Sequence, residues 1–192
     1  MIAILKYNAG NIKSVQNALN RLGYKSTITD DPDELLNADK VIFPGVGEAS
    51  TAINYLKERG LDRIITGLKQ PVLGICLGLQ LMCSHTEEGD TKCLGIFDTE
   101  VKLFPPVDKI PHMGWNNFLS LKGNLFRGIS FSDDLYYVHS YYAEISSNTI
   151  ATCEYILPFS AAMQKGNFYA TQFHPEKSAV TGEKILKNFL EL

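Results

Sequence analysis

Alternation between short strand-like runs and helical periods is the feature that most restricts the fold of the first 84 residues. The spacing predicts strands over residues 1–6, 25–29, 40–43 and 71–75. It predicts helices over residues 11–22, 32–37, 48–58, 61–68 and 77–84. A strand–helix–strand rhythm of this kind is typical of a parallel sheet that has helices on both faces.

The second half of the chain carries a different pattern. From about residue 93 to residue 173, short strand-like segments are separated by Gly, Pro, Asn and Asp, and a terminal helix is predicted over residues 181–190. We expect these segments to add strands, some of them antiparallel, to the same sheet. No repeat or low-complexity linker divides the 192 residues. We therefore predict one α/β domain over residues 1–192, with three layers (α/β/α) and a mostly parallel, twisted central sheet.

Composition excludes several classes of function. The formal net charge is -3, and no cluster of Lys and Arg indicates a nucleic-acid surface. Apolar runs are much shorter than the ~20 residues that span a bilayer, and residues 1–6 lack the basic start of a signal peptide. The four cysteines include no C-x-x-C pair, which argues against a metal site or a disulfide framework. We expect a cytoplasmic protein that needs no metal or cofactor.

A candidate nucleophile lies where the fourth predicted strand turns into a helix. Residues 74–80 read GICLGLQ, so Cys76 has one glycine two places before it and another two places after it. This is the pattern of a nucleophile elbow, in which a strained turn lifts the central side chain above the sheet. The N–H groups of the following helix, beginning with Leu77, favour a thiolate and can hold an oxyanion. The plainer alternative is a buried core cysteine between packing glycines.

A thiol nucleophile needs a base, and the base needs a third group that fixes its tautomer. His174 and Glu176 follow a strand-like run over residues 167–173. We expect Pro175 to keep this segment extended, so that the imidazole and the carboxylate point to one side. His139 is the rival base, although it has no acidic neighbour in the sequence. The plainer alternative for the predicted base is a surface or capping histidine before a turn.

Together, the cysteine elbow and the His-x-Glu pair resemble the class I (triad) glutamine amidotransferases. Further segments are similar, in particular, to the glutaminase subunits of imidazole glycerol phosphate synthase, which act in histidine biosynthesis. These segments are YNAGN at 7–11, PGVG at 44–47, PHMGWN at 111–116, VHSYY at 138–142 and ATQFHPEKS at 170–178. The resemblance covers essentially the whole chain. It departs from the family at His112, where the family often has Gln.

The resemblance implies a two-part reaction. This chain would hydrolyse L-glutamine to glutamate and ammonia through a thioester on Cys76, with His174 as the base and Glu176 as the carboxylate that orients it. A separate cyclase subunit with a (βα)₈-barrel fold would form a heterodimer with the chain. The cyclase would receive the ammonia, which crosses the barrel interior in this family, and make imidazole glycerol phosphate and an aminoimidazole carboxamide ribotide.

The resemblance also implies a glutamine site. Gln80 and Glu88 match the family's substrate contacts; the carboxylate of Glu88 suits the ammonium of glutamine, and backbone around Ser140 and Tyr141 suits its carboxylate. The plainer alternatives are a glutamine on a helix surface and a solvated acidic pair at 87–88.

The loop over residues 44–47 is the second candidate for oxyanion binding. By resemblance, the N–H of Val46 is the second oxyanion donor, Gly47 belongs to the same oxyanion hole, and Gly45 and Gly47 also line the substrate site. A glycine on each side lets this peptide turn over at little steric cost. We therefore hypothesise an activation switch, in which the oxyanion hole is assembled only when the partner is loaded. The plainer alternative is an ordinary strand-to-helix turn.

The candidate partner surface centres on Trp115, the only tryptophan, in a loop-like segment. The alternative is that this ring fills the core. By resemblance, the residues that face the cyclase are Asn8, Asn11, Met113, Trp115 and Lys177.

Three rival functions share parts of these motifs. The first is the glutaminase subunit of another triad amidotransferase, which feeds anthranilate, aminodeoxychorismate, pyridoxal phosphate or nucleotide synthesis. The PHMGWN and PGVG segments argue against it. The second is a non-catalytic docking or regulatory subunit, against which the intact Cys, His and Glu set argues. The third is a cysteine peptidase, which Gln80 and Glu88 disfavour.

Overall fold

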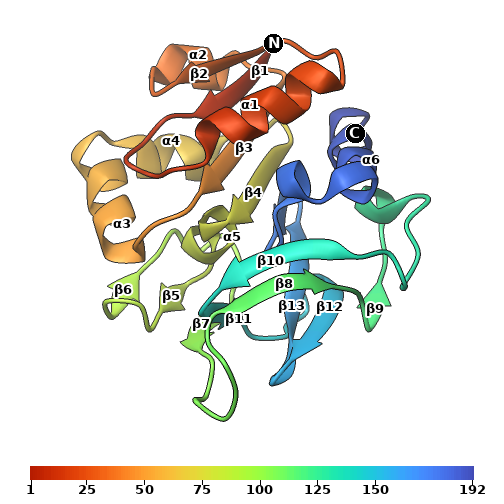
Figure 1. Cartoon of the computed structure of the whole chain (residues 1–192). Coiled ribbons are helices and arrows are strands. Elements are labelled where there is room, and N and C mark those ends of the chain that lie inside the picture. The colour runs from red at the N-terminus through yellow and green to blue at the C-terminus, as the bar shows by residue number, and fades with distance from the viewer.

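The first 82 residues fold into the alternating strands and helices that their spacing predicts. The computed structural model describes the whole chain, residues 1–192 (Figure 1). The strands of this half are β1 (Ile2–Leu5), β2 (Ser26–Thr29), β3 (Lys40–Gly45) and β4 (Val72–Cys76). The helices are α1 (Ile12–Arg21), α2 (Pro32–Leu36), α3 (Ala49–Glu58), α4 (Leu61–Gly67) and α5 (Leu77–Met82). Helix α5 is shorter than the predicted helix over residues 77–84.

The second half consists mainly of strands, as predicted. Its strands are β5 (His85–Thr86), β6 (Thr91–Lys92), β7 (Glu100–Leu103), β8 (His112–Asn116), β9 (Ser120–Leu121), β10 (Leu135–His139), β11 (Tyr141–Ala143), β12 (Thr149–Tyr155), β13 (Leu157–Lys165) and β14 (Phe168–Thr171). Two 3₁₀ turns, η1 (Asn124–Phe126) and η2 (Pro175–Lys177), and helix α6 (Ala179–Leu190) complete the chain.

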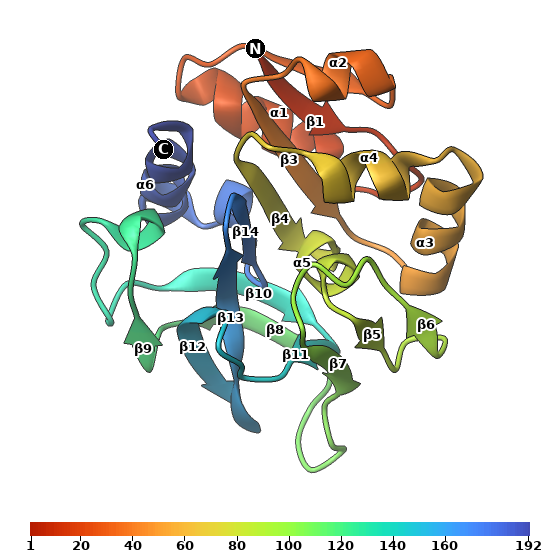
Figure 2. The same ribbon diagram turned by 180° about the vertical axis from the view of Figure 1, so that it is seen from behind.

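Eight strands form the central sheet, in the order β2-β1-β3-β4-β14-β13-β12-β9. The strands from β2 to β14 are parallel, and β13, β12 and β9 extend the sheet with antiparallel pairs. The predicted mixed, mainly parallel sheet is therefore confirmed. Because β4 lies between β3 and β14, the carboxyl ends of three parallel strands meet at one end of the sheet (Figure 2).

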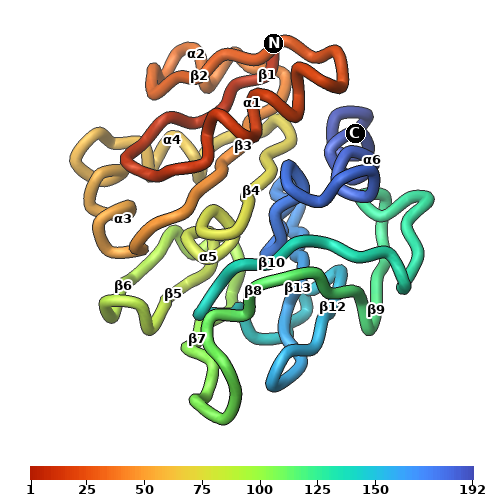
Figure 3. The backbone as a smooth tube through the Cα atoms, viewed as in Figure 1, coloured from red at the N-terminus to blue at the C-terminus, as the bar shows by residue number.

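Helices cover both faces of this sheet, which gives the three predicted layers (Figures 1 and 2). Successive residues of β1, Ala3 and Ile4, enter two separate apolar cores on opposite faces. One core includes side chains of α3, α4 and α5, and the other includes side chains of α1 and α6. Both chain ends lie at the top of the backbone trace in Figure 3. None of the helices combines the length and the apolar character that a membrane span requires.

The expectation that all strands of the second half join the central sheet is wrong. Strands β8 and β10 form a separate two-stranded ribbon, and β11, β7, β5 and β6 form a four-stranded sheet. In the ribbon, alternate side chains such as Tyr137 and His139 are buried, whereas Met113 and Trp115 are exposed. The ring of Tyr137 packs edge-on against Phe159 of β13. The ribbon thus buries one face on the central sheet and does not lengthen its edge.

Helix α5 packs so closely onto the sheet that glycine is required at its contact with β3. A Cβ atom added to Gly78 would lie 2.0 Å from the carbonyl oxygen of Phe43. A Cβ atom added to Gly74, on β4, would lie 3.0 Å from the backbone of Gly78. The two glycines of the GICLGLQ segment therefore allow the strand and the helix to approach each other.

We expect the substitution Gly78→Ala to destabilise the protein by about 2–3 kcal/mol, because the backbone of β3 or α5 must move to admit the methyl group. Urea unfolding measures this loss. Gly67→Ala is the matched control, because nothing lies within 4 Å of a Cβ atom at this position in α4. Equal stabilities of the two variants would contradict the close contact.

Candidate active site

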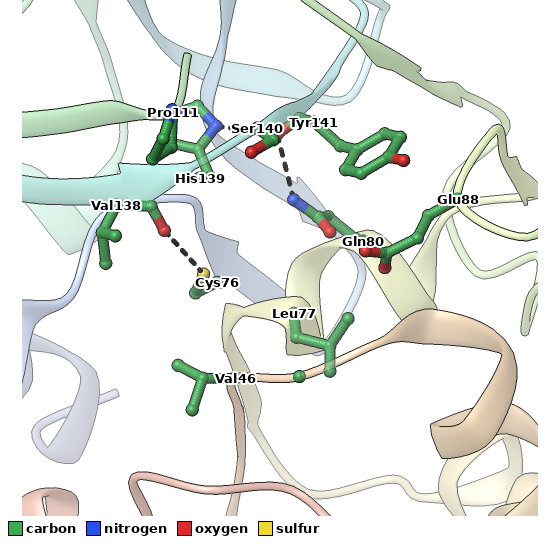
Figure 4. A pocket seen from close by; sticks show the side chains of 11 residues that line it. Val46, Cys76, Leu77, Gln80, Glu88, Pro111, Val138, His139, Ser140 and Tyr141 are labelled. Carbon is green, nitrogen blue, oxygen red and sulfur yellow. Dashed lines mark hydrogen bonds between the residues drawn. The ribbon is translucent and has the colours of Figure 1, made fainter.

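Cys76 ends β4 and immediately precedes α5. Its backbone has φ 54° and ψ -105°, a region that residues other than glycine rarely adopt. The side chain lines a cavity of about 250 Å³, although the residue as a whole is only 6% exposed (Figure 4). The sulfur is therefore shielded from bulk water and faces a cavity large enough for a small ligand.

His174 and Glu176 form a buried pair beyond the end of β14. Nδ1 of His174 lies 2.7 Å from Oε1 of Glu176, and Nε2 of His174 is buried without a hydrogen bond. Burial lowers the pKa of His174, but the sulfur of Cys76 and the Glu176 carboxylate together raise it by more, to about 10. Since Nδ1 is committed to the carboxylate, Nε2 is the ring nitrogen available to Cys76.

The backbone that brings this pair together differs from the predicted one. We expected an extended segment, but Pro175–Lys177 form the 3₁₀ turn η2. The fixed φ of proline suits the first position of such a turn. The residue before it, His174, remains extended with φ -100° and ψ 94°. The hydroxyl of Ser178 donates to the carbonyl of His174 at 2.6 Å and closes the turn.

Asn11 contacts the same pair from the first half of the chain. Its side-chain amide donates to Oε1 of Glu176 and lies 3.3 Å from Nδ1 of His174. Asn11 has φ 74° and precedes α1, but its side chain does not cap that helix. The resemblance implied a partner-facing Asn11. Here its amide is turned toward the carboxylate, where it helps to fix the orientation of an acceptor-only group.

The cavity brings together most of the predicted substrate and oxyanion residues. Its lining includes Val46, Gly47, Cys76, Leu77, Gln80, Glu88, Ser140 and Tyr141, and it adds Pro111, Val138 and His139, which the sequence did not indicate as ligand contacts (Figure 4). Gly45 does not line it. Instead, Gly45 pairs with Cys76 in the sheet and lies against the hydroxyl of Tyr7.

The carbonyl of Val46 accepts a hydrogen bond from the N–H of Gly10 at 3.1 Å. The backbone of Gly10 also lies close to the side chain of Val46, because a Cβ atom added to Gly10 would lie 2.9 Å from Cγ2 of Val46. Gly47 has φ 139°, which favours glycine. The 44–47 loop is thus attached to the loop that precedes α1.

Gln80 is held by two hydrogen bonds from one nitrogen. Its Nε2 donates to the carbonyl of Tyr141 at 3.0 Å (Figure 4) and to Oε1 of Gln172 at 3.1 Å. Gln172 in turn places its Nε2 3.6 Å from the sulfur of Cys76. Gln172 was not predicted from the sequence. The available signal was its position two residues before His174 near the end of a strand, where alternate side chains share a face.

Glu88 accepts a hydrogen bond from the N–H of Ala49, at the start of α3, at 2.8 Å. Burial raises the pKa of Glu88, and the bond from Ala49 partly offsets this effect. One oxygen is therefore occupied by the protein, and the carboxylate stands at the wall of the cavity as a fixed acceptor.

His139, the rival base, is committed to other partners. Its Nδ1 lies 2.7 Å from the carbonyl of Tyr141, and its Nε2 lies 3.0 Å from Nδ1 of His112. Because the carbonyl only accepts, Nδ1 of His139 carries hydrogen, and His112 must donate to the other nitrogen. Burial lowers the pKa of His139 to about 3 and that of His112 to about 4. Both rings are therefore neutral and neither ring nitrogen of His139 is free to act as the base.

The other predicted partner residues come from three parts of the fold: Met113 and Trp115 lie on β8 of the ribbon, Lys177 lies in η2, and Asn8 lies in the loop after β1. Trp115 is 55% exposed, so the alternative that it fills the core is wrong. Its ring contacts the ring of Tyr136, 5.9 Å away between centroids, and Nζ of Lys177 lies 6.0 Å above the same tyrosine ring. Met113 is also exposed, and the side chain of Asn8 donates to the carbonyl of Thr51 at 3.3 Å.

The glutamine amidotransferase class-I family model matches residues 3–192. The chain therefore belongs to the class-I glutamine amidotransferases. Solved structures agree in fold. A structure described as a glutamine amidotransferase has a TM-score of 0.75 at 18% identity, and covers 99% of this chain and 97% of its own. A glutamine amidotransferase of Thermotoga maritima has a TM-score of 0.65 at 16% identity, with 99% and 82% covered.

Relatives in sequence show which family within this class the chain belongs to. The chain is 60% identical over 194 residues to imidazole glycerol phosphate synthase subunit HisH of Bacteroides fragilis (strain YCH46), with 100% of this chain and 99% of the relative covered. It is 46% identical over 199 residues to the protein of the same name from Vibrio cholerae serotype O1, with 100% and 98% covered. Within the class, the chain belongs to the HisH family.

We expect His112 to contribute about 1 kcal/mol to the loss of unfolding free energy between pH 7.5 and pH 5.5, in addition to the loss that His139 causes in the same range. The pKa of His112 is lowered to about 4 in the folded protein and returns to about 6.5 on unfolding, so the unfolded chain binds more protons in this range. The contribution of His112 to stability is therefore present above pH 6.5 and is lost as the pH falls toward 4.

His112→Gln is the control for this prediction. A glutamine amide can donate to His139 as the imidazole does, but it does not titrate. Urea unfolding at both pH values should show a smaller loss in this variant. An equal loss in the two proteins would contradict the neutral, buried state of His112.

Proposed function

We propose that Cys76, His174 and Glu176 form the catalytic triad of a glutaminase that releases ammonia from L-glutamine. One observation carries the proposal. A strained cysteine faces a small cavity, and the histidine that has one nitrogen free for it is bound at 2.7 Å to a buried carboxylate. The pattern fits nucleophile, base and orienting acid in that order.

In the proposed reaction, the Cys76 thiolate attacks the side-chain amide carbon of glutamine and forms a tetrahedral intermediate. The Cys76 sulfur and the Glu176 carboxylate hold His174 as imidazolium. His174 gives its proton to the amide nitrogen, and ammonia leaves. The thioester that remains is attacked by water, whose proton His174 accepts. The second intermediate expels the Cys76 thiolate and yields glutamate. Glu176 orients the ring in both steps and stabilises its charged form.

Glutamine would lie in the cavity with its two ends recognised separately. Glu88 offers a fixed carboxylate to the ammonium. The Oε1 of Gln80 is free to accept a hydrogen bond from the substrate, because both hydrogen bonds of this side chain use Nε2. Backbone N–H groups near Ser140 and Tyr141 suit the substrate carboxylate. These contacts select an amino acid, which disfavours the peptidase alternative.

The oxyanion is proposed to bind the N–H groups of Leu77 and Val46. Leu77 begins α5, whose free N–H groups face the elbow. The Val46 loop is attached to Gly10, which supports the hypothesis that a partner acting on that neighbouring loop completes the hole. In this proposal, Gly45 and Gly47 allow the Val46 peptide to rotate and leave space for the substrate.

The partner is proposed to be a (βα)₈-barrel cyclase that forms a heterodimer with this chain and receives the ammonia. It would make imidazole glycerol phosphate and the aminoimidazole carboxamide ribotide of histidine biosynthesis, in the cytoplasm. The exposed side chains of Met113 and Trp115, with Lys177 beside Tyr136, support an interface near the triad. The whole chain, residues 1–192, is proposed to act as a single glutamine amidotransferase domain.

Glutamate release from L-glutamine tests this function. We expect the isolated chain to be about 10²–10³-fold slower than the complex with a ligand-loaded (βα)₈-barrel cyclase, because one oxyanion donor is missing until the loop is assembled. Cys76→Ser should abolish the activity of the complex, and a glutamine-analogue electrophile should label Cys76.

Cys153→Ser is the control, because Cys153 is buried in β12 away from the cavity. Equal rates for the isolated chain and the complex would rule out the switch. An inactive complex with an unlabelled Cys76 would favour the non-catalytic alternative. Activation by the synthase of another triad amidotransferase would contradict the choice of partner.

We expect Trp115→Ala to weaken binding of the cyclase by at least about tenfold, because exposed aromatic anchors dominate many interfaces. Its melting temperature should stay unchanged, since the ring is largely in solvent. Calorimetric titration measures the Kd. Leu36→Ala, an exposed site on α2, is the control; the same Kd for both variants would exclude Trp115 from the interface.

A further inference from the structure

Gln172 is a fully buried amide beside the candidate nucleophile. Its backbone N–H bonds to Ala161 on β13, which fixes the chain just beyond the end of β14. Its side chain makes two contacts, one with Gln80 at 3.1 Å and one with the sulfur of Cys76 at 3.6 Å. A buried amide is costly unless its polar atoms are bonded, so the contact with sulfur contributes to satisfying the nitrogen.

The direction of these hydrogen bonds follows from one backbone carbonyl. The Tyr141 carbonyl can only accept, so the Gln80 atom that lies 3.0 Å from it is the nitrogen. The same nitrogen lies 3.1 Å from Gln172, so the atom of Gln172 at that contact is the oxygen. The nitrogen of Gln172 therefore faces the sulfur of Cys76 and offers it an N–H group.

We propose that Gln172 is a further catalytic residue, which donates a side-chain N–H hydrogen bond to the thiolate of Cys76. The proposal rests on the proposed role of Cys76 as the nucleophile. A hydrogen bond to a charged acceptor is roughly twice as strong as one between neutral groups, so this donor favours the thiolate over the thiol. The carbonyl of Val138, 3.9 Å from the sulfur, acts in the opposite sense because it can accept only from the thiol.

The same hydrogen bond acts at two points of the reaction. Before attack it stabilises the electron pair that forms the bond to the amide carbon. When water has added to the thioester, the carbon–sulfur bond breaks and its electron pair returns to the sulfur. Gln172 then stabilises the departing thiolate, so its loss slows both formation and hydrolysis of the thioester. Gln80 has the separate task of holding Gln172 in the donating orientation.

Alkylation of Cys76 by iodoacetamide across a pH series tests the proposal in the isolated chain. Mass spectrometry of the Cys76 peptide separates this residue from the other cysteines. In Gln172→Met, which keeps the volume and removes the donor, the midpoint of the alkylation profile should move upward by about one pH unit. Below the midpoint, alkylation should be about threefold slower, because the thiolate fraction falls about tenfold while the more basic thiolate reacts about threefold faster. Gln172→Glu, which replaces the donor with a negative charge, should move it further.

Gln164→Met is the matched control, because the amide of Gln164 bonds to the hydroxyl of Tyr169 and does not line the cavity. Its profile should equal that of the unchanged protein. If Cys76 is not alkylated in the unchanged protein at any pH, the proposed function itself fails. If Cys76 is alkylated with the same midpoint in folded Gln172→Met, only the role of Gln172 is overturned.

A measurement on the unchanged sequence does not depend on how the variants fold. The ¹H and ¹⁵N signals of the Gln172 side-chain amide should move with pH at the midpoint of the alkylation profile. In Cys76→Ser they should not move at that pH. Signals that stay constant while Cys76 ionises would overturn the hydrogen bond.

Discussion

The close contact between α5 and the sheet is the constraint on which the site depends. Gly78 lies against the carbonyl of Phe43 so tightly that no side chain fits between them. That contact holds the turn at Cys76 in a backbone region that costs of order 1–3 kcal/mol, and the surrounding core supplies the compensation. The position of the Cys76 sulfur at the cavity is therefore set by the packing of α5 on the sheet.

His174, Glu176 and Gln172 come from the other half of the chain, and one carbonyl connects the two halves. The oxygen of Tyr141 accepts from Gln80 of α5 and from His139 of the ribbon. Through these two donors it orients Gln172 on one side and His112 on the other. Burial keeps the two histidines neutral, so the network needs no charge and its hydrogen bonds have a single consistent direction.

Much of the fold could be predicted from local pattern, because strands buried on both faces and amphipathic helices have distinct periods. The cysteine elbow and the His-x-Glu pair could also be predicted, and the structure brings the Cys76 sulfur close enough to His174 to raise its pKa. The separate ribbon was not predictable, because antiparallel partners are chosen by contacts distant in sequence. Gln172 was missed because a neutral buried amide leaves no pattern. The turn at Pro175 was missed because proline fits both an extended entry and the first position of a turn.

Strand β8 has one more consequence. His112 points inward and pairs with the neutral His139, whereas Met113 and Trp115 lie on the solvent side of the same strand. A slip of one residue against β10 would exchange these faces, burying Met113 and expelling the imidazole. Two unrelated requirements, a dry interior and an apolar exterior, thus fall on a single strand of five residues. The insertion or deletion of one residue in β8 would therefore disrupt both the buried histidine pair and the exposed apolar face.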